Sequence, residues 1–107
     1  MYIDCKQEIN LKNCMPKAED VKSLTEFFYA FSDLTRLKII ILLTIKPLCV
    51  GEIVSVLELN QTTVSHQLQI LRAQGIVDCN RNGKSIIYFI KNPNIEQMLT
   101  ASVEALW

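Results

Sequence analysis

Apolar side chains recur at helical spacing in successive segments between residues 16 and 74. Such spacing predicts amphipathic helices that bury one face. Residues that favour helix starts and stops mark the boundaries: Pro16, Ser32 or Asp33, and Pro47 at three starts, and Gly75 after a fourth helix at 61–74. We expect the second helix, which is apolar on most sides, to lie at the centre of the core.

The pattern changes after Gly75. The segments IVDCNR and KSIIYFI flank Asn82-Gly83, a dipeptide that favours a two-residue type I′ turn, so residues 76–90 are predicted to form a β-hairpin. A last helix is expected from Asn92-Pro93, with these residues on one side: Ile95, Met98, Leu99, Ser102, Val103 and Leu106. This stripe is too apolar for the outer surface of a monomer, and a dimer contact would cover it.

A chain of 107 residues can bury one modest core, so one domain is expected. Residues 1–15 show no clear period and are interpreted as an N-terminal arm or a weak helix ahead of a domain at 16–107. The predicted fold class is mainly α with a β-hairpin wing (α+β), a winged helix-turn-helix of about five helices plus a two-stranded wing. No apolar run approaches the roughly 20 residues of a membrane-spanning helix and no signal peptide opens the chain, so a cytoplasmic protein without a membrane partner is expected.

The formal net charge is zero, which alone argues against a nucleic-acid partner. The charges are unevenly distributed, however. Residues 59–94 contain four bases (Arg72, Arg81, Lys84, Lys91) and one acid (Asp78), so this stretch carries +3 and the rest carries −3. Such asymmetry can direct one face of a protein toward a polyanion.

The helix predicted at 61–74 has polar side chains and no acid on its outer faces, as a helix in the major groove of duplex DNA requires. The candidate DNA-binding residues of this helix are Gln61, Thr62, Thr63, Ser65, His66 and Gln69. In the hairpin, Arg81 and Lys84 are the candidates for phosphate contacts. The competing interpretation is an ordinary solvated surface helix. His66 is the only histidine and receives no metal-binding or catalytic role.

Four segments resemble the ArsR/SmtB metal-sensing repressors of bacteria and archaea: EFFYAFSDLTRLKIIILL, LCVGEI, TTVSHQLQILRAQGIV and NGKSIIYF. The resemblance covers roughly residues 26–91. It implies a homodimer formed by the first and last helices, which binds an inverted repeat in double-stranded operator DNA and represses until a ligand releases it. No sequence motif pairs a nucleophile with a base, so neither an enzyme nor an organic cofactor is expected.

The four cysteines are expected to be reduced thiols, with disulfides the least expected state. Cys49 is predicted in the first turn of the helix that begins at Pro47, where backbone N–H groups stabilise a thiolate, and Glu52 shares its face. The resemblance implies that Cys49 binds metal together with Cys5, Cys14 or both from the partner's arm, with Glu52 as a further candidate ligand. Cys79 is expected to pack as a small apolar residue.

Three thiolates suit the thiophilic ions Cd²⁺, Pb²⁺, Cu⁺ or trivalent arsenic, and Zn²⁺ if Glu52 is a fourth ligand. Gly51 replaces the second thiol of the Cys-Val-Cys found in arsenic- and cadmium-sensing relatives, which weakens the choice of metal. The zinc site of the last helix is rejected, since Asn92, Asn94 and Ala105 stand at its ligand positions. Two alternatives stay open: a repressor that responds to thiol oxidation or persulfide formation, and a winged helix that binds protein instead of DNA.

Overall fold

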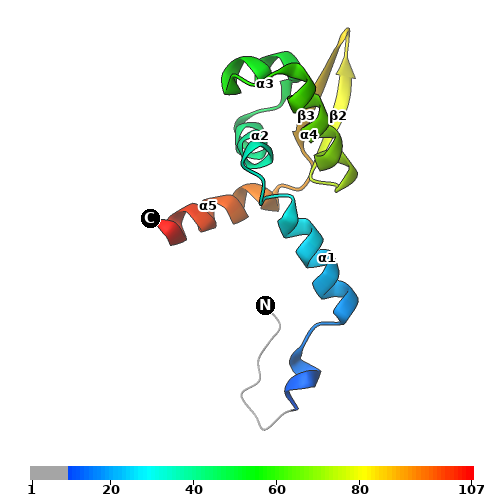
Figure 1. Ribbon diagram of the computed structural model, residues 1–107, viewed down its shortest axis with the longest axis vertical. Coiled ribbons are helices and arrows are strands. Elements are labelled where there is room, and N and C mark those ends of the chain that lie inside the picture. Colours follow the sequence, from blue (N-terminus) through cyan, green and yellow to red (C-terminus); the bar gives the residue numbers. More distant parts are fainter. Residues whose placement is uncertain (1–9) are drawn as a thin grey trace.

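The computed structural model describes residues 10–107. Its elements follow the order η1 (Leu11–Cys14, a 3-10 helix), α1 (Ala18–Tyr29), α2 (Leu34–Ile45), β1 (Leu48–Cys49), α3 (Val50–Leu57), α4 (Gln61–Ala73), β2 (Val77–Asn82), β3 (Ser85–Ile90) and α5 (Asn94–Leu106). Figure 1 shows α2, α3, α4 and the sheet gathered at one end, while α1 and η1 extend away from them. The predicted winged helix-turn-helix, mainly helical, is confirmed. In the described range, no helix has the length and apolar character needed to cross a membrane.

The core lies between α2, α3, α4 and the base of the hairpin. Its fully buried side chains include Ile39, Ile40, Ile53, Val64, Leu68, Leu71, Ile76 and Val77. The predicted central position of the second helix is therefore confirmed. Asp33 caps α2 by accepting a hydrogen bond from the backbone N–H of Arg36 at 2.9 Å, which decides between the two capping residues considered.

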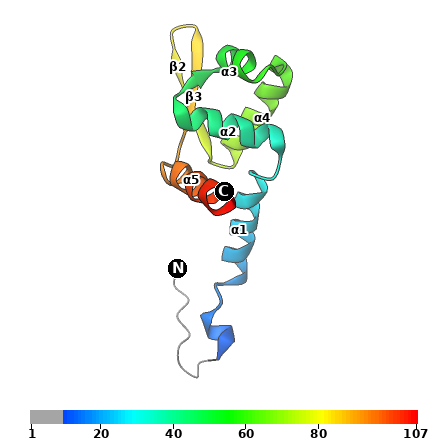
Figure 2. The ribbon, with the colours of Figure 1, turned by 90° about the vertical axis from the view of Figure 1, so that its left-hand side faces the viewer.

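The sheet has three antiparallel strands in the order β1-β3-β2, so the prediction of only two strands was incomplete. Leu48 pairs with Tyr88, and Cys49 pairs with Ile87. Figure 2 shows β2 and β3 side by side as one hairpin next to α2 and α3. The helix predicted from Pro47 begins only at Val50. Pairing with β3 satisfies backbone groups that the start of a helix would leave unpaired, and this long-range contact outweighs the local helix signal.

The hairpin turn lies one residue later than predicted. Asn82 pairs with Ser85, so the two-residue loop is Gly83-Lys84. Gly83 has a φ of 64°, and it is the only residue of this loop with a positive φ. A positive φ at the first loop position alone is the pattern of a type II′ turn, in place of the predicted type I′.

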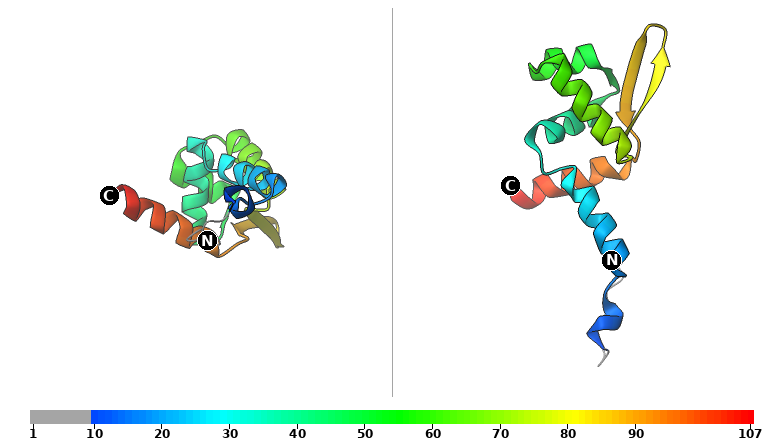
Figure 3. Two further views of the ribbon diagram at one scale, coloured as in Figure 1. Left: turned by 90° about the horizontal axis from the view of Figure 1, so that it is seen from below. Right: turned by 45° about the vertical axis from the view of Figure 1, so that its right-hand side comes forward.

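Helices α1 and α5 leave the body in different directions (Figure 3). Both carry exposed apolar side chains. In α1 no residue is buried, and Phe28 is 52% exposed. In α5 only Ile95 is buried, whereas Leu106 is 81% exposed. An open groove between α2 and α5 is lined largely by apolar side chains, among them Leu37, Ile41, Leu99 and Val103. The groove and the exposed apolar side chains of α1 are candidate contact surfaces.

Candidate nucleic-acid interface and thiol site

Helix α4 packs against the core on one side and is exposed to solvent on the other. At its start, Oδ1 of Asn60 accepts a hydrogen bond from the backbone N–H of Thr63 at 2.7 Å. Val64, Leu68 and Leu71 are buried, as their spacing predicts. The α4 residues that line an open hollow on the outer side, called here the reading face, are Gln61, Thr62, Ser65, His66 and Gln69.

The polar side chains of the reading face are available to bind a partner molecule. Within residues 10–107, none of its five side chains makes a hydrogen bond or an ion pair. Amides, hydroxyls and an imidazole held on a rigid helix can therefore donate to or accept from base edges and phosphates. Thr63, also predicted at this site, is half-buried and does not line the hollow. It stands four residues before Gln67 and shares that residue's side of α4.

The single acid of residues 59–94 is paired inside the domain. Oδ1 of Asp78 lies 3.4 Å from Nε of Arg72 and accepts a hydrogen bond from the backbone N–H of Cys79 at 2.8 Å. The N–H of Cys79, with the charges of Arg72 and Lys91, holds the pKa of Asp78 below its usual range. Asp78 therefore stays ionised beside Arg72, and that pair joins the end of α4 to β2.

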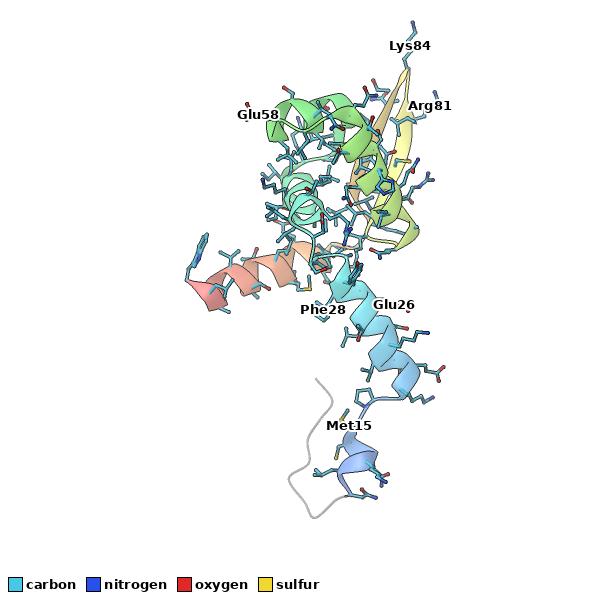
Figure 4. All side chains as sticks on the ribbon, viewed as in Figure 1. Met15, Glu26, Phe28, Glu58, Arg81 and Lys84 are labelled. Atoms are coloured by element: carbon cyan, nitrogen blue, oxygen red, sulfur yellow. The ribbon has the colours of Figure 1, made fainter. Side chains whose placement is uncertain are left out.

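The basic side chains of the hairpin point away from the body. Arg81 and Lys84 are exposed near its tip, where Figure 4 shows both projecting into solvent. Neither makes an ion pair within the part of the chain that the structure describes. They are thus available to a phosphate backbone beside the helix that carries the reading face.

The predicted thiol site is partly assembled by local structure. Cys49 is the N-cap of α3 and is half-buried, so its predicted place in the first turn was wrong, because the helix begins at Val50, three residues after Pro47. Its backbone N–H donates to Oε1 of Glu52 at 3.0 Å, within a capping box. The N–H and the thiol of Cys49 hold the pKa of Glu52 below its usual range, with a further contribution from the charge of Lys46. The thiol of Cys49, a soft metal ligand, therefore lies next to the carboxylate of Glu52, a hard one.

Cys14 of the arm is not brought to this thiol within one chain. Cys14 is disulfide-bonded, which corrects the expectation of reduced thiols throughout, whereas Cys49 and Cys79 are free. Cys5 lies outside the described residues. Figure 1 shows η1, which contains Cys14, at the opposite end of the molecule from α3. Among residues 10–107, no cluster of three histidine, cysteine, aspartate or glutamate residues could hold a metal ion.

The remaining cysteine has a different setting. Cys79 lies half-buried in β2, directly opposite Tyr88 of β3. Tyr88 packs against the core, and directly opposed residues of antiparallel strands share a face. Cys79 therefore points toward the core side of the sheet. Since Cys49 is opposite Ile87, it lies on the other face.

One polar contact near the reading face was missed from the sequence. Arg36 of α2 is buried and donates to Gln67 of α4. The only available signal was an arginine within a largely apolar helix, and such a side chain can equally extend its charged end to solvent.

Comparisons with known proteins agree with this architecture. The family described as "Bacterial regulatory protein, arsR family" matches residues 33–78. The chain is 38% identical over 85 residues to the cadmium resistance transcriptional regulatory protein CadC of Listeria innocua, covering 78% of this chain and 71% of the relative.

Two solved structures share this fold over most of the chain. The crystal structure of Rv0081 from Mycobacterium tuberculosis has a TM-score of 0.77 and 32% identity, covering 84% of this chain and 91% of that one. The homodimeric winged helix-turn-helix DNA-binding domain of Mb0332 from Mycobacterium bovis, a possible ArsR-family regulator, has a TM-score of 0.73 and 26% identity. That match covers 96% of this chain and 89% of the other.

Proposed function

The chain belongs to the ArsR family of bacterial regulatory proteins, and from this premise we propose that it is a homodimeric repressor, released from an inverted-repeat operator by a thiophilic metal ion. The observation that carries the proposal is the reading face, an open and acid-free surface of α4 next to a basic hairpin. The major groove admits one helix of this kind, and its base edges present the donors and acceptors that amides and hydroxyls recognise. Arg81 and Lys84 would contact the phosphates alongside.

A second copy of the chain is the proposed partner at the exposed apolar surface of α1, α2 and α5. Exposed apolar side chains are grouped there, among them Leu24, Phe28, Ile41, Val103 and Leu106. Large apolar side chains left exposed on helices mark a contact site, and a symmetric contact would pair each patch with its copy. The similar domain from M. bovis is described as homodimeric, which supports the same assembly here.

The proposed effector is a thiophilic metal ion that joins Cys49 to the partner's Cys5, Cys14 or both. Cys49 and Glu52 fit such an ion, because a thiol and an ionised carboxylate already stand together at the start of α3. The similar protein from L. innocua is a cadmium resistance regulator, which favours Cd²⁺ within the set of Cd²⁺, Pb²⁺, Zn²⁺, Cu⁺ and trivalent arsenic. Cys14 can contribute only after its disulfide is reduced, because the ligand is the thiolate.

Metal at Cys49 would act on DNA binding through packing. Helix α3 contacts both α2 and α4, so a displacement of its first turn would be transmitted to α4, which carries the reading face. The dimer would exist in two conformations, which differ in the distance between the two reading faces. An ion that binds more tightly to the conformation whose spacing does not match the operator shifts the equilibrium toward that conformation. Allosteric couplings of about 1–3 kcal/mol would lower operator affinity roughly 5- to 150-fold.

A redox-responsive repressor of the same fold is the second candidate, and the disulfide at Cys14 favours it. In that case oxidation or persulfide formation at the thiols replaces metal as the signal.

The decisive experiment measures operator binding by fluorescence anisotropy in reducing buffer while Cd²⁺, Zn²⁺ or Pb²⁺ is added. Loss of DNA affinity together with thiolate-to-metal absorbance supports the metal-responsive repressor. An unchanged affinity without that absorbance leaves the redox response, which a titration with oxidant or persulfide then tests. Failure to bind any duplex DNA at low salt would instead favour a protein-binding winged helix.

A further inference from the structure

Arg36 is the one buried charged side chain among residues 10–107, with 8% of its surface exposed. It lies in the first turn of α2, next to the junction with α1. Burial of an unpaired charge is costly, so a buried arginine is retained where its donors have partners in a fixed geometry. The partners of Arg36 come from two different helical segments.

The first set of partners is the end of α1. Nε of Arg36 donates to the carbonyl of Ala30 at 3.1 Å, and Nη2 donates to the carbonyl of Tyr29 at 3.2 Å. The guanidinium also lies over the ring of Tyr29, 5.4 Å from its centroid. Carbonyl groups at a helix end lack partners within the helix. The carbonyl of Tyr29 also accepts from the backbone N–H of Ser32 at 3.1 Å and from its hydroxyl at 2.7 Å, so the guanidinium and Ser32 together hold the last residues of α1 in one orientation.

The second partner is α4. Nη1 of Arg36 lies 3.4 Å from Oε1 of Gln67, whose side chain is half-buried. Gln67 lies between His66 of the reading face and the buried Leu68. One guanidinium thus connects the end of α1 to the helix that carries the reading face.

The remaining contacts of α1 leave its direction weakly determined. None of its residues is buried, and Phe27 at its end is only half-buried against the core. Figure 3 shows the rest of α1 extending from the body. Within one chain, the orientation of this helix therefore depends on the few contacts at its junction with α2.

We propose that Arg36, through Gln67, is a positioning residue that sets the angle between α1 and α4 and thereby the half-site spacing that a dimer recognises. A helix of 12 residues is about 18 Å long, so a tilt of about 10° at its end moves the other end by about 3 Å. Successive base pairs are about 3.4 Å apart along duplex DNA. A tilt of about 10° at the junction of α1 and α2 would therefore change the spacing of the half-sites by about one base pair.

The inference rests on the proposed dimeric DNA binding, and the experiment separates the two. The wild-type protein first selects duplex DNA from a random pool. Two variants of the selected duplex are then made, with one base pair fewer or one more between the half-sites. Binding is measured for the wild type, Gln67→Met and Arg36→Lys. Gln74→Met is the matched control, because Gln74 is exposed at the end of the same helix and its side chain has no hydrogen-bond partner among the described residues.

The wild type and Gln74→Met should prefer one spacing by about fivefold or more, a coupling of ordinary allosteric size. Gln67→Met should bind a single half-site as the wild type does but lose this preference or move it by one base pair. Arg36→Lys should do the same if it folds, since an ammonium group cannot replace the fork of donors. If Gln67→Met keeps the wild-type preference, the inference is wrong even if Arg36→Lys cannot fold. If the wild type selects no DNA, the proposed function fails first and this inference fails with it.

Discussion

The backbone N–H of Cys49 donates a hydrogen bond to Oε1 of Glu52 at 3.0 Å, so one carboxylate both caps α3 and stands beside a free thiol. This hydrogen bond has two consequences. It stabilises the start of the helix by satisfying a donor that would otherwise lack a partner. It also orders two potential metal ligands before any ion binds, which lowers the cost of assembling a site.

Glu52→Gln should lower the melting temperature at neutral pH and have little effect under acidic conditions. The pKa of Glu52 is lowered in the folded protein from its usual value of 4.5. Its stabilisation is therefore complete above that value and is lost as the pH falls through the lower, folded pKa. Thermal unfolding followed by circular dichroism between pH 3 and 7 measures this. Glu58→Gln, which removes a carboxylate at the exposed end of the same helix and leaves the Cys49–Glu52 hydrogen bond in place, is the matched control.

Arg81→Ala and Lys84→Ala should weaken binding to specific and nonspecific duplexes by similar factors. Removing one phosphate-binding cation should reduce the slope of log affinity against log salt concentration by about 0.9. Anisotropy titrations over a salt series measure both quantities. An unchanged slope for both variants would show that the hairpin does not bind the DNA backbone.

Gln69→Ala should change which operator sequence is preferred. Removing a side chain that hydrogen-bonds a base costs about 1–3 kcal/mol at that base pair and less elsewhere. Selection from a random pool, with wild type and variant in parallel, detects the change. Thr63→Ala should also alter the preference if Thr63 reaches a base, although its half-buried place outside the hollow makes Gln69 the stronger test. An equal reduction in affinity on every sequence for both variants means that the reading face has been misassigned.

Cys49→Ser should preserve DNA binding and abolish release by metal, because serine retains the size of the side chain but is a poor ligand for soft ions. Cys79→Ser is the matched control, since Cys79 is also a free, half-buried thiol but lies on the other face of the sheet. Operator release by Cd²⁺ is measured for both. A Cys49→Ser protein that still releases DNA when Cd²⁺ is added contradicts the proposed site.

Val103→Glu should produce folded monomers, because Val103 is 44% exposed and lines the groove between α2 and α5. A carboxylate buried in a dimer interface without a partner costs several kcal/mol. Sedimentation velocity measures the oligomeric state, and circular dichroism reports folding. Gln97→Glu, an exposed position of the same helix outside that groove, should remain dimeric. Equal dimerisation of both variants would remove this surface from the proposed interface.

The amino-acid sequence alone determined the features that depend on neighbouring residues. The spacing of Val64, Leu68 and Leu71 identified the buried side of α4, and Gly75, with a φ of 74°, ends the turn that follows it. The distribution of charge likewise distinguished the basic stretch from the rest of the chain. These signals are local, because helix periodicity and backbone preference act over a few residues.

Only the tertiary structure decided the features that depend on distant segments. Pairing of Leu48 and Cys49 with β3 made Cys49 a helix cap, although Pro47 locally favours an earlier start. Burial of Arg36 required carbonyl groups from α1 and an amide from α4 to converge on one guanidinium. Such pairings join residues that are far apart in the chain, and their free energy depends on the assembled core, which no local pattern encodes.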